Sequence, residues 1–234
     1  MTFFKKDPEV QWLNSYLLNN EPFENCLQNF SLPLGLSGNL WIGFADPSSE
    51  SIHNIIRIDQ DTSFKMLQNL IRLKKQLRKP PYDIEYLIMD SAAGNTYGTV
   101  NVMLITNASL FIIKISNADI FGTSQMIAGL YKQLKSRSLV LGNLIPSTDD
   151  DSKKFDDIKK LIEEQFMEDI GKKAVEFLGW IPTDQKLQKL EFNAAIKRLK
   201  GDKVSRVIYT LNQPNHVFSK TLSEIIPSLF GEVE

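Results

Sequence analysis

The stretch "SLVLGNLIP", residues 138–146, is a short apolar run, and the segments on either side of it decide the fold class. Two similar runs lie nearby, "SLFIIKIS" at 109–116 and "AVEFLGWIP" at 174–182. Between these runs, residues 122–136 and 153–168 have the length and composition of helices. Short buried strands that alternate with helices of this length predict βαβ crossovers. We therefore expect an α/β fold with a mostly parallel sheet and helices on both faces.

The remaining segments extend this alternation toward both ends of the chain. The run "NLWIGFADPSS" at 39–49 is continuously apolar at its start, which predicts a strand buried on both faces. Helical spacing begins at Asp61, with Thr62 or Ser63 available as the N-cap. The other predicted elements are two short helices within 8–29, strands at 84–89 and 203–211, a helical turn after residue 182, and helices at about 97–106 and 216–230. Because there is no internal repeat and no low-complexity linker, we expect a single domain over residues 1–234.

The composition excludes several classes of protein. Across 234 residues, 27 Lys and Arg are balanced by 28 Asp and Glu, so the net charge of -1 gives no general attraction to nucleic acid or anionic lipid. The single cysteine excludes an internal disulfide, and the two histidines leave no Cys/His cluster of zinc-site spacing. The first residues lack the apolar core of a signal peptide, and no apolar run is long enough to span a bilayer. We expect a soluble, cytoplasmic protein with no integral membrane segment.

Three groups of polar residues follow predicted strands and are candidate site residues. Asp90 directly follows the run "IEYLIM". Asn143 lies near the end of the run at 138–146. Pro182 ends the run at 174–182, and Thr183 and Asp184 follow it. Open parallel sheets bind ligands beyond the carboxyl ends of their strands, so these residues are expected to converge. Taken singly, each also has a structural explanation, as a cap, a turn or the start of a helix.

The order and spacing of these segments resemble the ParA/MinD family of deviant Walker-A ATPases, from about Trp12 to Phe230. "YDIEYLIMDSAAG" looks like the Walker B strand and switch II, and "LVLGNLIP" is similar to the strand that ends in the family's adenine-reading Asn. "FLGWIPTDQKLQKLEF" resembles the segment whose loop closes over the adenine. "LWIGFADPSSESI" and "IYTLNQPNHVFSKTLSEI" are similar to segments of archaeal MinD-like proteins. The resemblance implies a P-loop NTPase-like (Rossmann-like) fold and ATP hydrolysis linked to chromosome partitioning or cell-division positioning.

The resemblance also implies a role for each candidate residue. Asp90 would act through a water on Mg²⁺, because a hard cation that bridges phosphate oxygens takes carboxylate and water ligands. Gly94 would bring a backbone N–H close to the γ-phosphate, with no Cβ in the way. Asn143 and the segment 182–184 would bind the adenine side of ATP. As partners, the family implies a second copy of the chain or another protein, and nonspecific DNA.

The sequence departs from the family in two places. Its switch II reads "DSAAG", without the prolines that are usual there. No Gly-x4-Gly-Lys-Ser/Thr occurs, and Met1 aligns beyond the family's first strand, lysine-bearing loop and helix, as in an N-terminally truncated member. Loss of a central strand would expose backbone donors and acceptors on its neighbours. ATP and Mg²⁺ are therefore expected as cofactors only where the missing loop is supplied.

Two functions stay open at this point, with a third behind them. In the first, the chain is a MinD/ParA-like ATPase whose N-terminus is incomplete in this sequence. In the second, it is a non-catalytic interaction protein that keeps the ATPase fold without binding nucleotide. The third is an unrelated α/β enzyme with Asp90 as general acid or base, for which the sequence offers no partner residue.

The other reactive or charged residues have simpler explanations. His53 is expected to be an exposed or packing histidine, His216 to lie at the N-cap of the final helix, and Cys26 to be a small core residue. The basic run "RLKKQLRK" at 72–79 lies at the end of a predicted helix, where its positive charges complement the helix dipole. It is either a solvated face of that helix or a surface that contacts nucleic acid. The final helix lacks the Lys and Arg density of a membrane-targeting helix, so it is expected to pack on the sheet.

Overall fold

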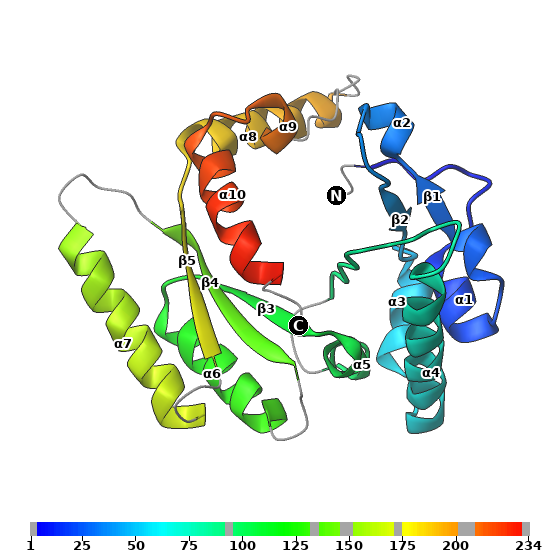
Figure 1. Cartoon of the computed structure of the whole chain (residues 1–234), viewed down its shortest axis with the longest axis horizontal. Coiled ribbons are helices and arrows are strands. Elements are labelled where there is room, and N and C mark those ends of the chain that lie inside the picture. Colours follow the sequence, from blue (N-terminus) through cyan, green and yellow to red (C-terminus); the bar gives the residue numbers. More distant parts are fainter. Residues whose placement is uncertain are drawn as a thin grey trace. The chain divides into compact units, whose positions relative to one another are not determined.

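The computed structural model describes residues 4–91, 96–131, 136–145, 152–170, 175–200 and 209–230. These residues form two compact units, an N-terminal unit over Phe4–Thr106 and a C-terminal unit over Asn107–Glu234 (Figure 1). Each unit is described by itself below. The expected single domain over 1–234 stays a prediction.

The C-terminal unit is built on a three-stranded parallel sheet. Its strands are β3 (Ala108–Ile113), β4 (Arg137–Ile145) and β5 (Val175–Pro182), in the order β3-β4-β5. The crossovers between them are α6 (Asn117–Tyr131) and α7 (Ser152–Ile170). The predicted βαβ alternation is confirmed, and the run quoted first forms the central strand.

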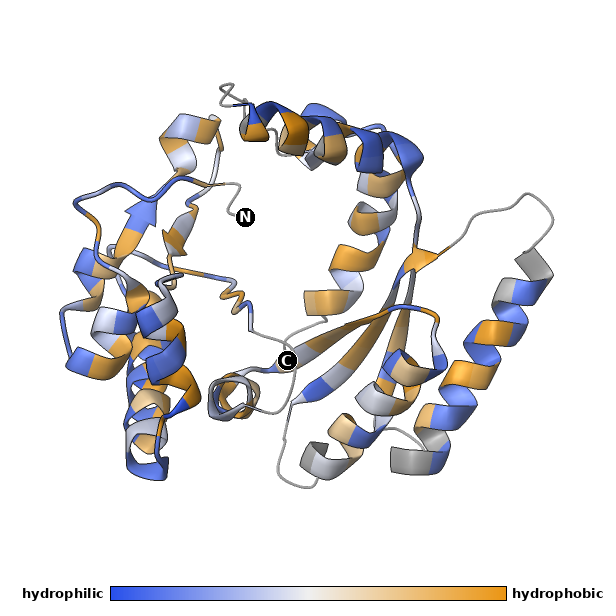
Figure 2. Ribbon diagram, turned by 180° about the vertical axis from the view of Figure 1, so that it is seen from behind, coloured by the Kyte–Doolittle hydropathy of each residue, from blue (hydrophilic) through white to orange (hydrophobic). Residues whose placement is uncertain are grey.

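Helices cover this sheet on both faces, as predicted. Val140 and Phe177 pair across β4 and β5, and the Lys159 ammonium of α7 lies 5.7 Å from the centroid of the Phe177 ring. On the other face, Ile225 of α10 (Val217–Phe230) packs with Leu141 and Ile181. The strands have mostly hydrophobic colour, whereas α7 is hydrophilic over much of its length (Figure 2). The two remaining helices of this unit are α8 (Gln185–Leu199) and α9 (Tyr209–Asn212).

The face that α10 covers is open over β3. Leu110 and Ile112 of β3 pair with Leu139 and Leu141 of β4, so all four side chains point to this face. Leu139 and Leu141 are 1% and 3% exposed, whereas Leu110 and Ile112 are 39% and 60% exposed. The burial of this face therefore stops at the boundary between β4 and β3.

Close packing between β4 and β5 leads to a first prediction, at Gly142. A methyl group at this position would overlap the six-membered ring of Trp180, which lies opposite Gly142 in the parallel pair. Gly142→Ala should therefore lower the free energy of unfolding by about 1–3 kcal/mol, the usual cost of overpacking. Gly129→Ala is the matched control: Gly129 lies in α6 with open space around its Cα, and alanine there should stabilise the protein by about 0.5–1 kcal/mol. Urea denaturation of both variants checks this, and equal shifts in the same direction would contradict it.

The N-terminal unit is mainly helical around a small apolar core. Its elements are α1 (Leu13–Asn19), η1 (Phe23–Cys26), β1 (Leu27–Asn29), α2 (Ser31–Leu34), β2 (Trp41–Gly43), α3 (Ser49–Ile56), α4 (Gln60–Leu77) and α5 (Tyr97–Ile105). Strands β1 and β2 pair antiparallel. The core cluster consists of Tyr16, Phe23, Cys26, Leu73, Leu77 and Tyr82. The predicted helices at 61–77 and 97–106 are confirmed in outline, whereas of the two expected within 8–29 the first is α1 and the second is only the short 3-10 turn η1, followed by strand β1.

Several predicted details of this unit are wrong. The segment 84–89 forms no strand, and Tyr86, Leu87 and Ile88 are 53%, 38% and 82% exposed. The run at 39–49 forms only the three residues of β2, half-buried and antiparallel rather than buried on both faces. The N-cap of α4 is Asp59, whose carboxylate accepts a hydrogen bond from the Thr62 N–H at 2.8 Å, in place of Thr62 or Ser63.

Two predictions for the C-terminal unit also need correction. The expected helical turn after residue 182 is the full helix α8, over Gln185–Leu199. The strand expected at 203–211 falls mostly outside the described residues, and its last residues, from Tyr209, belong to α9. The final helix is confirmed as α10 and packs on the sheet as expected.

Candidate functional site

The candidate residues of the C-terminal unit lie where β4 and β5 end. Because the strands are parallel, their carboxyl ends lie side by side, with Ile145 opposite Pro182. The Thr183 N–H donates a hydrogen bond to the Ile145 carbonyl at 2.7 Å, which extends the pairing past the end of β5. The structure thus brings Asn143 together with the segment 182–184, as predicted, while their role in binding stays a prediction.

The end of β4 has an irregular backbone at the candidate residue itself. The pairing register shifts between Gly142 and Ile145, so Asn143 and Leu144 form a bulge. Leu144 has a φ of 57°, a left-handed conformation that costs a non-glycine residue roughly 1 kcal/mol. The Asn143 side-chain oxygen accepts a hydrogen bond from the Leu144 N–H at 2.9 Å, which supports that conformation. Bulges and strained residues of this kind are frequent at binding sites, where they redirect a side chain.

Asp184 fixes the start of the helix that follows β5. Its Oδ1 accepts a hydrogen bond from the Leu187 N–H at 2.7 Å, so it is the N-cap of α8. The Gln188 N–H donates to the Asp184 carbonyl at 3.0 Å and completes the first helical turn. The structural explanation of Asp184 as a cap is therefore confirmed.

The second carboxylate oxygen of Asp184 contacts a residue from the far end of the chain. Its Oδ2 lies 3.1 Å from His216 Nε2, and the two side chains are only 15% and 19% exposed. His216 Nδ1 accepts a hydrogen bond from the Phe218 N–H at 3.3 Å, which leaves Nε2 as the nitrogen that carries the proton. The ring of Tyr209 packs edge-on against His216, with centroids 5.1 Å apart. Partial burial and the charge of Asp184 raise the pKa of the Tyr209 hydroxyl above its ordinary value.

The predicted Mg²⁺ ligand lies in the other unit. Asp90 is exposed and belongs to the irregular segment after α4, so it does not end a strand as predicted. A strand at this point would need a hydrogen-bonded neighbour, and the only sheet described in the N-terminal unit is the β1-β2 pair. Gly94 lies outside the described residues. Convergence of Asp90 with Asn143 stays a prediction.

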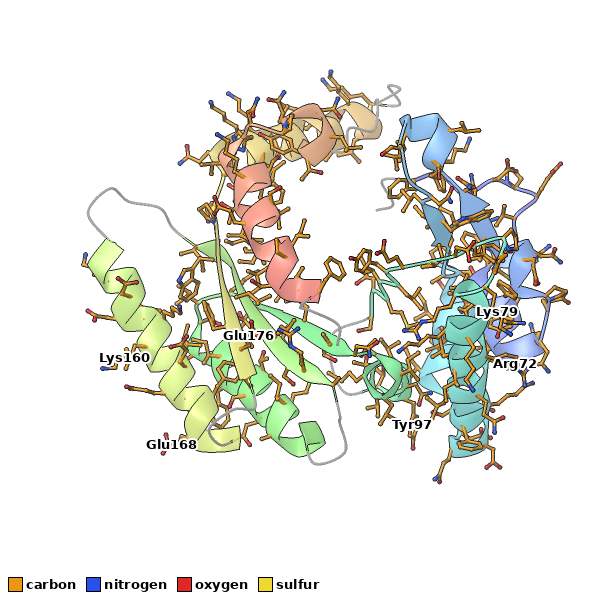
Figure 3. All side chains as sticks on the ribbon, in the orientation of Figure 1. Arg72, Lys79, Tyr97, Lys160, Glu168 and Glu176 are labelled. Atoms are coloured by element: carbon orange, nitrogen blue, oxygen red, sulfur yellow. The ribbon has the colours of Figure 1, made fainter. Side chains whose placement is uncertain are left out.

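The other predicted residues behave as their simpler explanations require. Cys26 is fully buried, and burial raises the pKa of its thiol, which argues against a nucleophile. His53 is exposed on α3. In the basic run, the Lys74 ammonium donates to the Ile105 carbonyl at 2.6 Å, so one of its cations supports the end of α5. Arg72 and Lys79, labelled in Figure 3, belong to its solvated part.

Two hollows among the described residues lie away from these candidate residues. Two open hollows, of about 250 Å³ and 400 Å³, are lined by α4 with α5 and by α6 with α7, and neither includes Asn143 or the segment 182–184. Within the described ranges, no three His, Cys, Asp or Glu residues are grouped so as to hold a metal ion. No helix that the structure describes combines the length and apolarity needed to cross a membrane.

Solved structures with the same arrangement come from cell-division proteins. The MinC:MinD cell division protein complex of Aquifex aeolicus matches with a TM-score of 0.60 and 18% identity, over 97% of this chain and 75% of that chain. The chain has a MinD-like fold. The cell division ATPase MinD of Pyrococcus furiosus matches with a TM-score of 0.55 and 17% identity, over 96% and 78% of the two chains. At these identities the likeness is one of fold. No protein-family model and no curated protein matches the chain.

Two residues of the candidate site, His216 and Tyr209, were not predicted there from the sequence. His216 was expected only as a helix cap, and Tyr209 was expected in a strand. His216 contacts Asp184 directly, and the Tyr209 ring of α9 packs against His216. The sequence offers only a weak signal for the contact between His216 and Asp184. A histidine before one helix and an aspartate at the N-cap of another occur often without contacting each other.

Proposed function

We propose that this chain belongs to a MinD/ParA-like, ATP-binding protein and that the carboxyl ends of β4 and β5 bind the adenine side of the nucleotide. The observation that supports this most is the parallel pairing of Gly142 and Ile145, on either side of Asn143, with Trp180 and Pro182 within a MinD-like fold. In open α/β sheets, this end of the strands is where ligands bind.

The chemistry of these residues suits a planar base. The Asn143 amide offers both a donor and an acceptor, which is the combination that reads the edge of adenine. Pro182, opposite Ile145 at the end of β5, adds an apolar side chain, and the start of α8 follows Thr183 and Asp184. When bound, Mg²⁺ would neutralise phosphate charge; the family resemblance would assign its water-mediated carboxylate to Asp90 and a backbone contact near the γ-phosphate to Gly94. Asp90 is exposed, as suits a carboxylate that contacts an ion through a water.

The wider role would follow the MinD and ParA proteins, in chromosome partitioning or cell-division positioning in the cytoplasm. One of the similar structures is a MinC:MinD complex, so a partner protein or a second copy of this chain is part of the proposal. Nonspecific DNA contact would use the solvated part of the basic run at 72–79. Hydrolysis requires the Gly-rich, lysine-bearing loop, supplied by a longer form of the protein or by the partner.

Calorimetry with Mg-ATP on protein purified from its native source tests this proposal, together with the intact mass of the same sample. Asn143→Ala should weaken ATP binding about tenfold, the usual cost of losing a hydrogen bond in a desolvated site. Asn193→Ala, on the exposed surface of α8, is the matched control and should bind as the wild type does. Asp90→Ala should remove the Mg²⁺ dependence of binding.

Two outcomes would contradict the nucleotide proposal. One is equal ATP affinity in the wild type, Asn143→Ala and Asn193→Ala. The other is a folded native-source protein that binds no adenine nucleotide at all. The second outcome would favour a non-catalytic interaction protein, a function that the exposure of Leu110 and Ile112 on the sheet already supports.

A further inference from the structure

Two hydrogen bonds and one ion-pair contact hold the segment proposed to close over the base. The Thr183 N–H binds the end of β4 through the Ile145 carbonyl, at 2.7 Å. One oxygen of Asp184 binds the first turn of α8 through Leu187, also at 2.7 Å. The other oxygen binds His216, at 3.1 Å. The first two contacts are local to the strands and the helix, whereas the third comes from the turn before α10.

His216 is itself held firmly. Its N–H donates to the Gln213 carbonyl at 3.1 Å, and its own carbonyl accepts from the Lys220 N–H at 2.9 Å. Its Nδ1 accepts from the Phe218 N–H, and the Tyr209 ring packs against it. These contacts leave the ring one orientation, with Nε2 directed at Asp184. The imidazole is therefore held in place, with Nε2 3.1 Å from the Asp184 carboxylate.

The helix that follows His216 contacts the same strands just before the candidate residues. Ile225 of α10 packs against Leu141 and Ile181, which precede Asn143 and Pro182. The single helix α10 thus contacts β4 and β5 at the base of the site and, through His216, contacts the segment beyond them. A shift at either end of α10 would move the residues that are proposed to meet the base.

We propose that His216 is a positioning residue for the nucleotide base: its 3.1 Å side-chain contact with Asp184 holds the segment 182–184 in the geometry that closes over adenine. This rests on the nucleotide site proposed above. Asp184 is largely buried, and a buried carboxylate that loses one of its partners must move toward water or remain unpaired. Without His216, the segment is therefore expected to swing outward while β4 and Asn143 stay in place.

The test compares His216→Ala, His216→Gln and His53→Ala in the full-length protein, with Mg-ATP and Mg-GTP as probes in calorimetry. A glutamine can donate from nearly the same place as Nε2, and His53, exposed on α3, provides the same substitution in the other unit. His216→Ala should lower ATP affinity about tenfold and bring the ratio of ATP to GTP affinity close to one. His216→Gln should recover most of the affinity and the selectivity, and His53→Ala should match the wild type.

Selectivity separates positioning from general destabilisation. Hydrogen exchange at the Leu187 amide reports the start of α8, and His216→Ala should weaken its protection. Weaker protection together with unchanged ATP-to-GTP selectivity would overturn the inference, because the role would be structural only. A wild type that binds ATP, with His216→Ala equal to it in affinity and selectivity, would overturn the inference and leave the proposed function standing. A wild type that binds no adenine nucleotide would overturn both.

Discussion

Replacing Leu139 by alanine should lower the free energy of unfolding of the C-terminal unit by about 2–5 kcal/mol. Leu139 lies in the central strand β4 and is 1% exposed, so its loss removes buried apolar contacts and leaves a cavity that neighbouring side chains fill only in part. The measurement is urea denaturation, with hydrogen exchange in the peptides of β3, β4 and β5 to assign the loss to this unit.

The control for this prediction lies directly across the strand pair. Leu110 of β3 is opposite Leu139 in the register and points to the same face, yet it is 39% exposed. Leu110→Ala should therefore cost less than half as much, because water already reaches the side chain. Equal costs for the two substitutions would contradict the open face described for β3. They would instead indicate that a second chain covers Leu110 in solution.

The sheet of the C-terminal unit could be predicted from sequence because its signals are local. Each strand is a short apolar run, and each crossover is a long segment of different character, so the order of runs alone indicates parallel pairing. The central strand was predicted at 138–146 and lies at Arg137–Ile145. The helix at 61–77 was equally clear, from apolar spacing over Gln60–Leu77.

The failed strand at 84–89 shows where local signals stop. Its composition is that of a buried strand, but a strand also needs a partner that satisfies its backbone N–H and C=O groups. Composition says nothing about whether that partner exists in the same chain. The prediction for the segment after Pro182 was wrong for a different reason. The cap at Asp184 was recognised as an alternative, but only a helical turn was predicted where the helix α8 spans Gln185–Leu199.

The residues of the candidate site also fall into two groups: those with a local sequence signal and those placed by long-range contacts. Asn143 and the segment 182–184 could be found from sequence because they follow predicted strands that pair in parallel. His216 could not, since its contact with Asp184 depends on how α10 crosses the sheet. The resemblance to a family indicates which loops matter, whereas contacts between distant side chains require coordinates.

Asn69, in the N-terminal unit, is another long-range polar contact of this kind, and its replacement is the second large prediction. The chain leaves the last carbonyls of α1 without partners inside that short helix. The side-chain amide of Asn69, in α4, donates to the carbonyls of Tyr16 and Leu17 at 3.3 and 3.0 Å. The Tyr16 hydroxyl in turn donates to the Asn69 carbonyl at 2.8 Å, and Asn69 is only 3% exposed.

Asn69→Leu should therefore lower the free energy of unfolding of the N-terminal unit by about 2–4 kcal/mol, since it keeps the volume but leaves two buried carbonyls unsatisfied. Gln68→Leu, one position earlier and exposed on the same helix, introduces the same side chain and should change stability by less than about 0.5 kcal/mol. Urea denaturation compares the two, and hydrogen exchange in the α1 peptide locates the effect. If both variants unfold at the same urea concentration, the amide of Asn69 does not hold α1, and the other contacts of that helix with α4 must fix it, including the Lys65 ammonium that donates to the Leu18 carbonyl at 2.9 Å.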